Sequence, residues 1–291
     1  RLRKVRNTMA ENAREIVLDT LLEIERNKVF SNQLLKSVLD KYDYLDVQDK
    51  RFIKRLTEGC VERRIELDYY LNQYSSVPVN KMKPLIRCLM RMGVYQIVYM
   101  DKIPDAAVCN EAVKLADKRK FVNLKGFVNG VLRKISRNKE NLPLPQESKA
   151  LEYLSVKYSM PEWIVEMWFQ EYGKEDTEIL LKALSGIHPV CVRFTTNLSR
   201  EQREAYVVKW EEQGVIAKQS EIVPYVYMLE AVDGISGLEG FAEGVFTVQD
   251  ISSVLCVEAA GLKETDVAMD ICAAPGGKTM LAAETCSKVY A

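Results

Sequence analysis

The sequence predicts a multidomain protein: an all-α bundle, then a small α+β module, then the start of an α/β domain. Three observations support this prediction. Apolar residues recur at three- and four-residue spacing through residues 9–139. After a proline-containing linker, the pattern changes to alternating strand-like and helix-like segments. Near residue 270, a strand-like segment runs into a glycine turn and a helix. A length of 291 residues suits two or three domains.

The composition excludes several classes of protein. No apolar run approaches the roughly 20 residues that span a bilayer, and the basic N-terminus lacks the apolar core of a signal peptide. A single histidine and scattered cysteines without a CxxC pair argue against a metal site or a disulfide framework. We therefore expect a cytoplasmic protein with reduced thiols, no membrane segment and no metal. No methionine precedes Met9, so the first residues resemble the interior of a longer reading frame.

The net charge of zero hides an asymmetry. Residues 1–139 hold 29 Lys and Arg against 17 Asp and Glu, whereas the remainder is acidic. A basic half suggests contact with a polyanion, since phosphate contacts need several cations on one surface. The alternative is that these cations only keep helix faces soluble. As a set they favour RNA or DNA, and the candidate RNA-binding residues are Lys50, Arg51, Lys54, Arg55, Arg63, Arg64 and Arg133.

The first half reads as a bundle of about six or seven helices. Segments with helical periodicity cover residues 11–30, 31–42, 46–74, 83–100, 104–120 and 121–138. Ser31 is a possible N-cap of the second segment, and Pro104 stands just inside the start of the fifth.

The linker spans residues 138–149, where two prolines and polar residues stop any helix. A short amphipathic helix is expected beyond it, with Pro161 near its start. A β-α-β-β pattern follows, and its segments are 189–196, 199–214, 215–220 and 224–231. Residues 244–261 then read as a strand and a helix that begins at Gln249-Asp250, and 267–271 as a short buried strand.

The glycine turn stands in "MDICAAPGGKT" (269–279). Glycines allow a ligand to approach the backbone, Pro275 stiffens the turn, and the helix N-terminus offers free N–H groups. A phosphate-binding P-loop would need glycine where Cys272 stands, and the G-x-G-x-x-G of dinucleotide folds is absent. On the glycines alone, a plain turn in an α/β domain stays open.

The full string is more specific, and it resembles motif I of the RNA 5-methylcytosine methyltransferases of the NOL/NOP/Sun group. In that family CAAPGGK is the S-adenosylmethionine loop at the first strand of a Rossmann-like sheet. "GVFTVQDISSVLCVEAAG" (244–261) is similar to the preceding family motif beside the cofactor. "HPVCVRFTTNLSREQ" (188–202) loosely resembles the family's ferredoxin-like linking module. The helical half is similar to NusB-like RNA-binding domains.

This order of parts is that of the RsmB/Sun family, whose members methylate C5 of a cytosine in 16S rRNA. The resemblance implies four regions: a NusB-like domain (1–139), a linker (140–150), linking helices with the ferredoxin-like module (151–240), and the beginning of a Rossmann-like domain (241–291). It also implies that S-adenosylmethionine is bound by Cys272, Ala273, Ala274, Pro275, Gly276, Gly277 and Lys278. The partner would be 16S rRNA, and a monomer is expected.

Two roles stay open for each residue that flanks the loop. Asp270 would either orient the loop or meet the methionine amine of the cofactor. Lys278 would either meet the cofactor's carboxylate or simply occupy the first helical turn.

The family mechanism uses two cysteines: one thiolate adds to C6 of cytosine, and the second helps release the product. The resemblance places both beyond residue 291, and Cys272 is a cofactor-loop residue. "SKVYA" (287–291) resembles the second Rossmann strand. We therefore expect a chain cut within its catalytic domain, which does not methylate RNA alone and binds S-adenosylmethionine weakly or not at all. The alternative is a non-catalytic NusB-like RNA-binding factor in antitermination or ribosome assembly.

Overall fold

The computed structural model describes residues 13–186, 189–232 and 234–291. They fall into two compact units that divide between Gly186 and Ile187. The basic residues of the extreme N-terminus and the single histidine, His188, lie outside the described residues. Within the part that is described, no helix combines the length and apolar content needed to cross a membrane.

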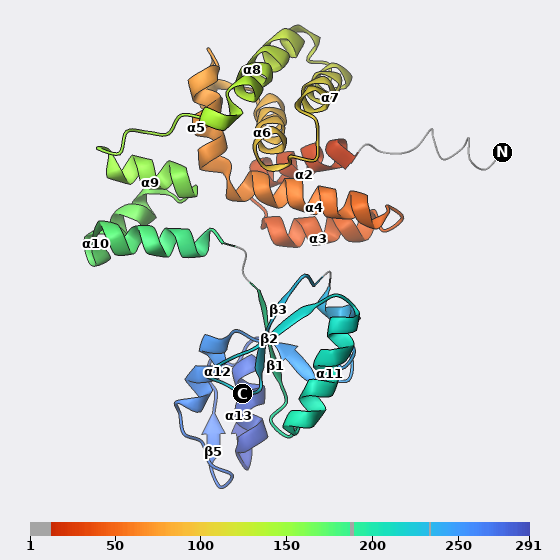
Figure 1. Ribbon diagram of the computed structural model, residues 1–291, viewed down its shortest axis with the longest axis vertical. Helices are drawn as coiled ribbons and strands as arrows, with labels where there is room; N and C mark the ends of the chain where they lie inside the picture. The colour runs from red at the N-terminus through yellow and green to blue at the C-terminus, as the bar shows by residue number, and fades with distance from the viewer. Residues whose placement is uncertain (1–12, 187–188, 233) are drawn as a thin grey trace, which may run out of the picture. The chain divides into compact units, whose positions relative to one another are not determined.

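The N-terminal unit is built of helices (Figure 1). In chain order they are α2 (Ala13–Asn27), α3 (Ser31–Lys41), α4 (Val47–Glu62), α5 (Arg64–Tyr74), α6 (Pro84–Tyr99), α7 (Asp105–Lys118), α8 (Lys125–Arg137), α9 (Ala150–Tyr158) and α10 (Glu162–Leu184). The segment predicted as one long helix from Asp46 is divided at Arg63, whose backbone leaves the helical region. Short 3₁₀ turns occupy Val79–Lys81, Val122–Leu124 and Lys139–Asn141.

Helices α2 to α8 enclose one apolar core. On α4 the side chains of Ile53, Leu56 and Cys60 are almost fully buried. Helix α6 is the most enclosed helix of the unit, with ten buried residues between Ile86 and Ile97. The three- and four-residue spacing of apolar residues in the sequence therefore agrees with the buried faces of these helices.

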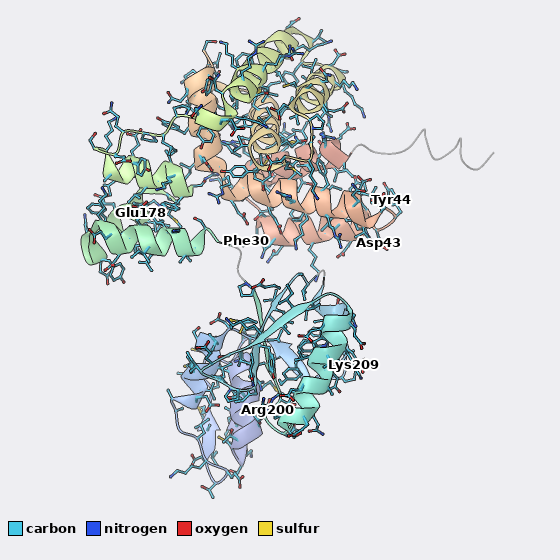
Figure 2. All side chains as sticks on the ribbon, viewed as in Figure 1. Phe30, Asp43, Tyr44, Glu178, Arg200 and Lys209 are labelled. Carbon is cyan, nitrogen blue, oxygen red and sulfur yellow. The ribbon has the colours of Figure 1, made fainter. Side chains whose placement is uncertain are left out.

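Two helix starts differ from the expectation. Ser31 is the first residue of α3 rather than its N-cap, and Phe30 stands at the cap position without a side-chain hydrogen bond. The Phe30 side chain is exposed (Figure 2). Pro104 lies one residue before α7, as its N-cap. A serine predicts a cap only when the chain turns at it, and here the turn comes one residue earlier. Asp46, by contrast, caps α4 by accepting from Asp49 N at 2.8 Å.

A network of ion pairs joins α2, α5 and α6. Glu25 pairs with Arg87, and also with Arg91 at 2.9 Å. Arg91 in turn pairs with Asp68 at 2.6 Å. Burial alone would raise the pKa of Glu25, but the hydrogen bond from Arg87 and the charges of both arginines hold it below its ordinary value.

This network predicts a pH dependence of stability. A carboxyl whose pKa is lower in the folded state than in the unfolded chain stabilises the fold at any pH above its pKa in the unfolded chain, which is about 4.5 for Glu25. That stabilisation is lost as the pH falls through the pKa of the folded state. We expect the free energy of unfolding of the N-terminal unit to decrease as the pH falls below about 4.5. The decrease should be less steep in Glu25→Gln. Urea titrations followed by circular dichroism across this pH range would measure both slopes.

The control for that experiment is Asp43→Asn. The Asp43 side chain is 87% exposed and its ion pair with Lys50 is screened by solvent (Figure 2). The hydrogen bond from Lys50 lowers the pKa of Asp43, but solvent screening makes this coupling weak, so the Asp43→Asn slope should stay much closer to the wild type than that of Glu25→Gln. A Glu25→Gln slope equal to the wild type would contradict the assignment.

The C-terminal unit contains a four-stranded antiparallel sheet in the order β2-β3-β1-β4. Its strands are β1 (Val190–Phe194), β2 (Ile216–Gln219), β3 (Val226–Glu230) and β4 (Phe246–Val248). Helix α11 (Arg200–Glu212) connects β1 to β2. The β-α-β-β pattern expected from the sequence is therefore confirmed.

The two faces of this sheet carry different side chains. Val192, Phe194 and Phe246 pack with Trp210 of α11 on one face. On the other face, Val226 packs against α12 (Ile251–Glu258) and α13 (Gly277–Thr285) through Val254 and Leu281. Because side chains alternate along a strand, Arg193 lies on the face toward α12 and α13.

Strands β5 (Val267–Met269) and β6 (Lys288–Tyr290) form a parallel pair, and α13 connects them (Figure 1). The expectation that β5 is buried is wrong. Val267 is 64% exposed and Met269 72% exposed. The reason is that among the described residues β5 pairs with one strand only, and its outer face has no covering element.

Candidate functional site

The glycine turn borders a hollow of about 220 Å³. All seven residues from Cys272 to Lys278 that the resemblance implies as cofactor-binding line this hollow. Five further residues line it, and they are Val248, Gln249, Asp250, Ser253 and Asp270. The structure therefore brings the loop after β5 together with the segment between β4 and α12, 20 residues earlier in the chain.

Asp270 fixes the path of the loop. Its Oδ1 accepts from the backbone N of Cys272 at 3.1 Å, and its Oδ2 accepts from Thr279 Oγ1 at 2.6 Å. Its own N–H donates to Tyr290 O at 2.7 Å, which extends the β5–β6 ladder. Of the two roles left open by the sequence, the contacts of Asp270 are those of the residue that orients the loop.

The two glycines serve different purposes. Gly276 is the N-cap of α13 with φ of 106°, a left-handed conformation that only glycine adopts without strain. Gly277 has an ordinary φ, but a Cβ there would lie 3.7 Å from the side-chain amide of Gln249. The loop therefore leaves open both the helix N-terminus and the space beside Gln249.

A chain of buried polar groups reaches the hollow from the four-stranded sheet. Gln249 Oε1 accepts from Arg193 Nε at 2.7 Å, and Arg193 Nη1 donates to Glu284 Oε1 at 2.8 Å. Glu284 Oε2 accepts from Thr196 N at 2.8 Å. Arg193 is 2% exposed and Gln249 6% exposed. The chain joins β1, the end of β4 and α13.

Strand register explains why Arg193 and Gln249 meet. Arg193 of β1 lies opposite Thr247 of β4. Gln249, two residues after Thr247, is therefore on the same face of the sheet and is a diagonal neighbour of Arg193. The N–H of Gln249 donates to Cys191 O at 3.1 Å and continues that register. The sequence interpretation placed Gln249 at a helix start but did not count it in the site. Two signals in the sequence could have found this pair. Arg193 is a charged residue within an apolar strand, and the alternation of faces along the strand places Gln249 on the face opposite to that of Phe246.

Asp250 has a structural role. It is the N-cap of α12, where Oδ1 accepts from Ser252 Oγ at 2.6 Å and from Ser252 N at 2.8 Å. These two hydrogen bonds hold the pKa of Asp250 below its ordinary value. The carboxylate is thus directed toward its own helix.

The hollow fits part of a small polar ligand that carries acceptor oxygens. Within the described residues the Nε2 of Gln249 is buried and has no hydrogen-bond partner. Small side chains and glycines form much of the wall, and the first N–H groups of α13 have no partner within the helix. A donor-rich wall of this kind favours an anionic or carbonyl oxygen.

The candidate RNA-binding residues occupy two places on the bundle. Six of the seven lie on α4, at its junction with α5, or at the first residue of α5, whereas Arg133 lies on α8. Several of the six also make contacts within the bundle, among them the ion pair of Lys50 with Asp43. Arg55 Nη2 donates to Tyr99 O at 2.6 Å, and Arg63 stacks over the Tyr99 ring at 5.5 Å.

Two polar hollows of the bundle contain members of this set. Arg64 lines one of about 590 Å³ together with Arg87 and Arg91. Arg133 lines one of about 470 Å³ between α7 and α8, with two lysines that the sequence interpretation did not select. These are Lys114 and Lys125. The spacing of four residues from Lys125 through Asn129 to Arg133 on one helix was the signal that could have found it.

Comparison with known sequences identifies the two parts of the fold. The NusB family matches residues 11–137, and the family described as Methyltr_RsmF/B-like, ferredoxin-like domain matches residues 160–233. A helical NusB-like region is thus followed by a ferredoxin-like α+β module.

The chain is also similar over most of its length to curated proteins. It is 34% identical over 277 residues to the probable ribosomal RNA small subunit methyltransferase B of Bacillus subtilis, covering 94% of this chain and 60% of that protein. The protein of the same name from Synechocystis sp. is 31% identical over 277 residues, with the same coverage. The resemblance to the RsmB/Sun family is confirmed by these matches. The chain spans about 60% of the length of these relatives.

A solved structure shares the fold. The crystal structure of PH0851 matches with a TM-score of 0.65 at 22% identity, covering 92% of this chain and 60% of that chain. At this identity the likeness concerns the arrangement of elements alone.

Proposed function

We propose that the protein acts in the S-adenosylmethionine-dependent methylation of C5 of a cytosine in 16S rRNA. The activity is that of the whole protein, of whose relatives this chain spans about 60%. The observation that carries the proposal is the hollow at residues 272–278, where a loop held by Asp270 meets the buried amide of Gln249. The names of the relatives, ribosomal RNA small subunit methyltransferase B, support the reaction class and the substrate.

The C-terminal region is proposed as the beginning of a Rossmann-like domain. Its support is the parallel pair β5 and β6 connected by α13, since a strand–helix–strand crossover is the unit of such sheets. The proposed regions remain 1–139, 140–150, 151–240 and 241–291, with the cofactor held in the last.

Each part of the loop has a role in this proposal. Bound S-adenosylmethionine would supply the methyl group from its sulfonium. Gly276 and Gly277 let a ligand approach the backbone, and the N-terminal N–H groups of α13 and the Lys278 ammonium favour a carboxylate there. Cys272 is proposed as a wall of the cofactor site and not as the nucleophile.

Two exposed cysteines allow a direct test of cofactor binding. Cys272 lines the hollow, whereas Cys256 lies on α12 and is not among the lining residues. We expect S-adenosylhomocysteine, a non-reactive analogue, to slow the alkylation of Cys272 by iodoacetamide and leave that of Cys256 unchanged. The physical reason is steric cover of a thiol within the site. Quenched time courses read by peptide mass spectrometry would give both rates, at ligand concentrations high enough to reveal weak binding.

The same experiment separates the two functions considered for this protein. Equal alkylation rates of Cys272 with and without ligand, in this chain and in the whole protein alike, would contradict a cofactor site at the loop. The non-catalytic NusB-like RNA-binding factor would then be the better proposal.

RNA binding is assigned to the bundle. Removing one cation that neutralises a phosphate lowers the slope of log K against log[salt] by about 0.7 for single-stranded RNA. We expect Lys125→Ala combined with Arg133→Ala to reduce that slope by about 1 to 1.5 in titrations of a 16S rRNA fragment. Fluorescence anisotropy at several salt concentrations would measure it. Lys209→Ala, in the other unit, is the control (Figure 2). An equal change in that control would contradict the assignment to the bundle.

A further inference from the structure

We infer that Gln249 is a ligand-binding residue of the cofactor site. Its side-chain NH₂ donates to the carboxylate of the amino-acid part of S-adenosylmethionine, and Arg193 and Glu284 hold the amide in that orientation. This assignment rests on the proposed function. It adds that Gln249 is the residue, and the amino-acid carboxylate the part of the cofactor, that contact each other.

The hydrogen bond to Arg193 determines which way the amide points. An arginine N–H can only donate, so the group that receives Arg193 Nε at 2.7 Å must be the amide oxygen of Gln249. The NH₂ group is therefore on the other side of the amide. Arg193 itself cannot turn easily, because it is 2% exposed and its Nη1 also donates to Glu284 Oε1 and to Phe194 O.

The NH₂ group lies at the wall of the hollow, next to Gly277. The Nε2 of Gln249 and a Cβ built on Gly277 would be 3.7 Å apart, so the amide lies beside the first residue of α13. Its residue is 6% exposed, and among the described residues no acceptor meets this nitrogen. A buried donor without a partner is unfavourable, so a donor directed into a lined hollow indicates an acceptor that arrives with the ligand.

Asp250 and Asp270 line other parts of the hollow, but the end at α13 favours an anionic acceptor. The N-terminus of α13 and Lys278 both favour negative charge. The carboxylates nearby are already engaged: Glu284 by Arg193, Asp250 by Ser252, and Asp270 by Cys272 N and Thr279. The amino-acid carboxylate is the anionic group of S-adenosylmethionine, so it is the acceptor that fits Gln249.

The test compares two ligands on the full chain. S-adenosylhomocysteine carries the amino-acid carboxylate, whereas 5′-methylthioadenosine lacks the amino-acid part. In Gln249→Glu the side chain still accepts from Arg193 but has no NH₂ to donate. We expect this variant to bind S-adenosylhomocysteine about 10- to 100-fold more weakly, and 5′-methylthioadenosine within about twofold of the wild type. Heteronuclear NMR titration would measure both dissociation constants into the millimolar range.

A second variant and a control complete the design. Gln249→Met removes the donor without adding charge and should show the same selective loss. Gln213→Glu, at the exposed end of α11, should bind both ligands as the wild type does. In the wild type, the side-chain NH₂ resonances of Gln249 should shift with S-adenosylhomocysteine and not with 5′-methylthioadenosine.

The outcomes distinguish this inference from the function on which it rests. Suppose that the wild type binds S-adenosylhomocysteine. If the Gln249 variants then bind both ligands more weakly by the same factor, or bind both as the wild type does, the role of Gln249 is overturned and the cofactor site stands. If neither ligand binds to the wild type, in this chain and in the whole protein alike, both are overturned.

Discussion

Replacing Arg193 by methionine is expected to lower the free energy of unfolding of the C-terminal unit by about 1–3 kcal/mol. Removing this buried arginine leaves its acceptors without their donor. Here the substitution would leave the Glu284 carboxylate, 20% exposed, and the amide oxygen of Gln249 without their partner. Methionine keeps much of the volume, so the effect would come from the polar contacts rather than from a cavity.

An exposed arginine in the same unit provides the control. Arg200 pairs with Glu204 on α11 at 2.7 Å, but their side chains are 72% and 52% exposed (Figure 2). Solvent screens such an exposed pair, so Arg200→Met should change the stability of the unit little. Hydrogen exchange with mass spectrometry in increasing urea would follow β1, β3 and β4 separately from the bundle. Equal destabilisation in the two variants would contradict a structural role for the buried pair.

Replacing Trp210 by alanine is expected to cost the same unit about 3–5 kcal/mol. Trp210 is fully buried, stacks on Phe194 at 5.2 Å and meets Phe246 edge-on at 4.8 Å. Its Nε1 also donates to Glu239 O at 3.1 Å. Alanine would leave a large cavity between α11 and the sheet and remove the partner of that carbonyl.

Val208→Ala is the matched control, since Val208 lies on the same helix and is 54% exposed. Its effect should stay within about 0.5 kcal/mol. Hydrogen exchange is again the suitable measurement, because Trp163 and Trp168 of α10 would dominate a fluorescence signal. Exchange in the bundle should be unchanged by either substitution. A large decrease in protection there would show that the two units do not unfold independently.

Much of the secondary structure could be predicted from the sequence because apolar spacing is a local signal. The helices of the bundle and the order β1, α11, β2, β3 follow directly from it. The burial of β5 was not predictable in this way. A short apolar strand indicates burial only if other elements cover it, and Val267 and Met269 have no such cover among the described residues. The Ser31 cap failed because the position of a turn depends on tertiary packing.

In the candidate site, too, the features that are local in the sequence could be predicted, whereas those that depend on tertiary packing could not. The loop residues 272–278 form a contiguous motif, and the structure places all of them around one hollow. Gln249, Arg193 and Glu284 come from segments up to 91 residues apart, so only the register of β1 with β4 and the packing of α13 bring them together. For the basic residues, the charge pattern of the sequence indicated candidates for RNA binding. It could not indicate which of these residues line the same hollow.

The way in which β4 leads into α12 has a consequence for mutational tolerance. Val248 is the last residue of β4 and Ile251 the first of α12, so only Gln249 and the N-cap Asp250 separate the sheet from the helix. Deleting or inserting a single codon within β4 would exchange the two faces of the strand. Because the change lies between Phe246 and Gln249, only one of them can keep its register: either Phe246 leaves the aromatic core or Gln249 turns away from Arg193. Saturation libraries of this gene should therefore accept many substitutions at exposed Val248 while rejecting every one-residue length change between Phe246 and Asp250.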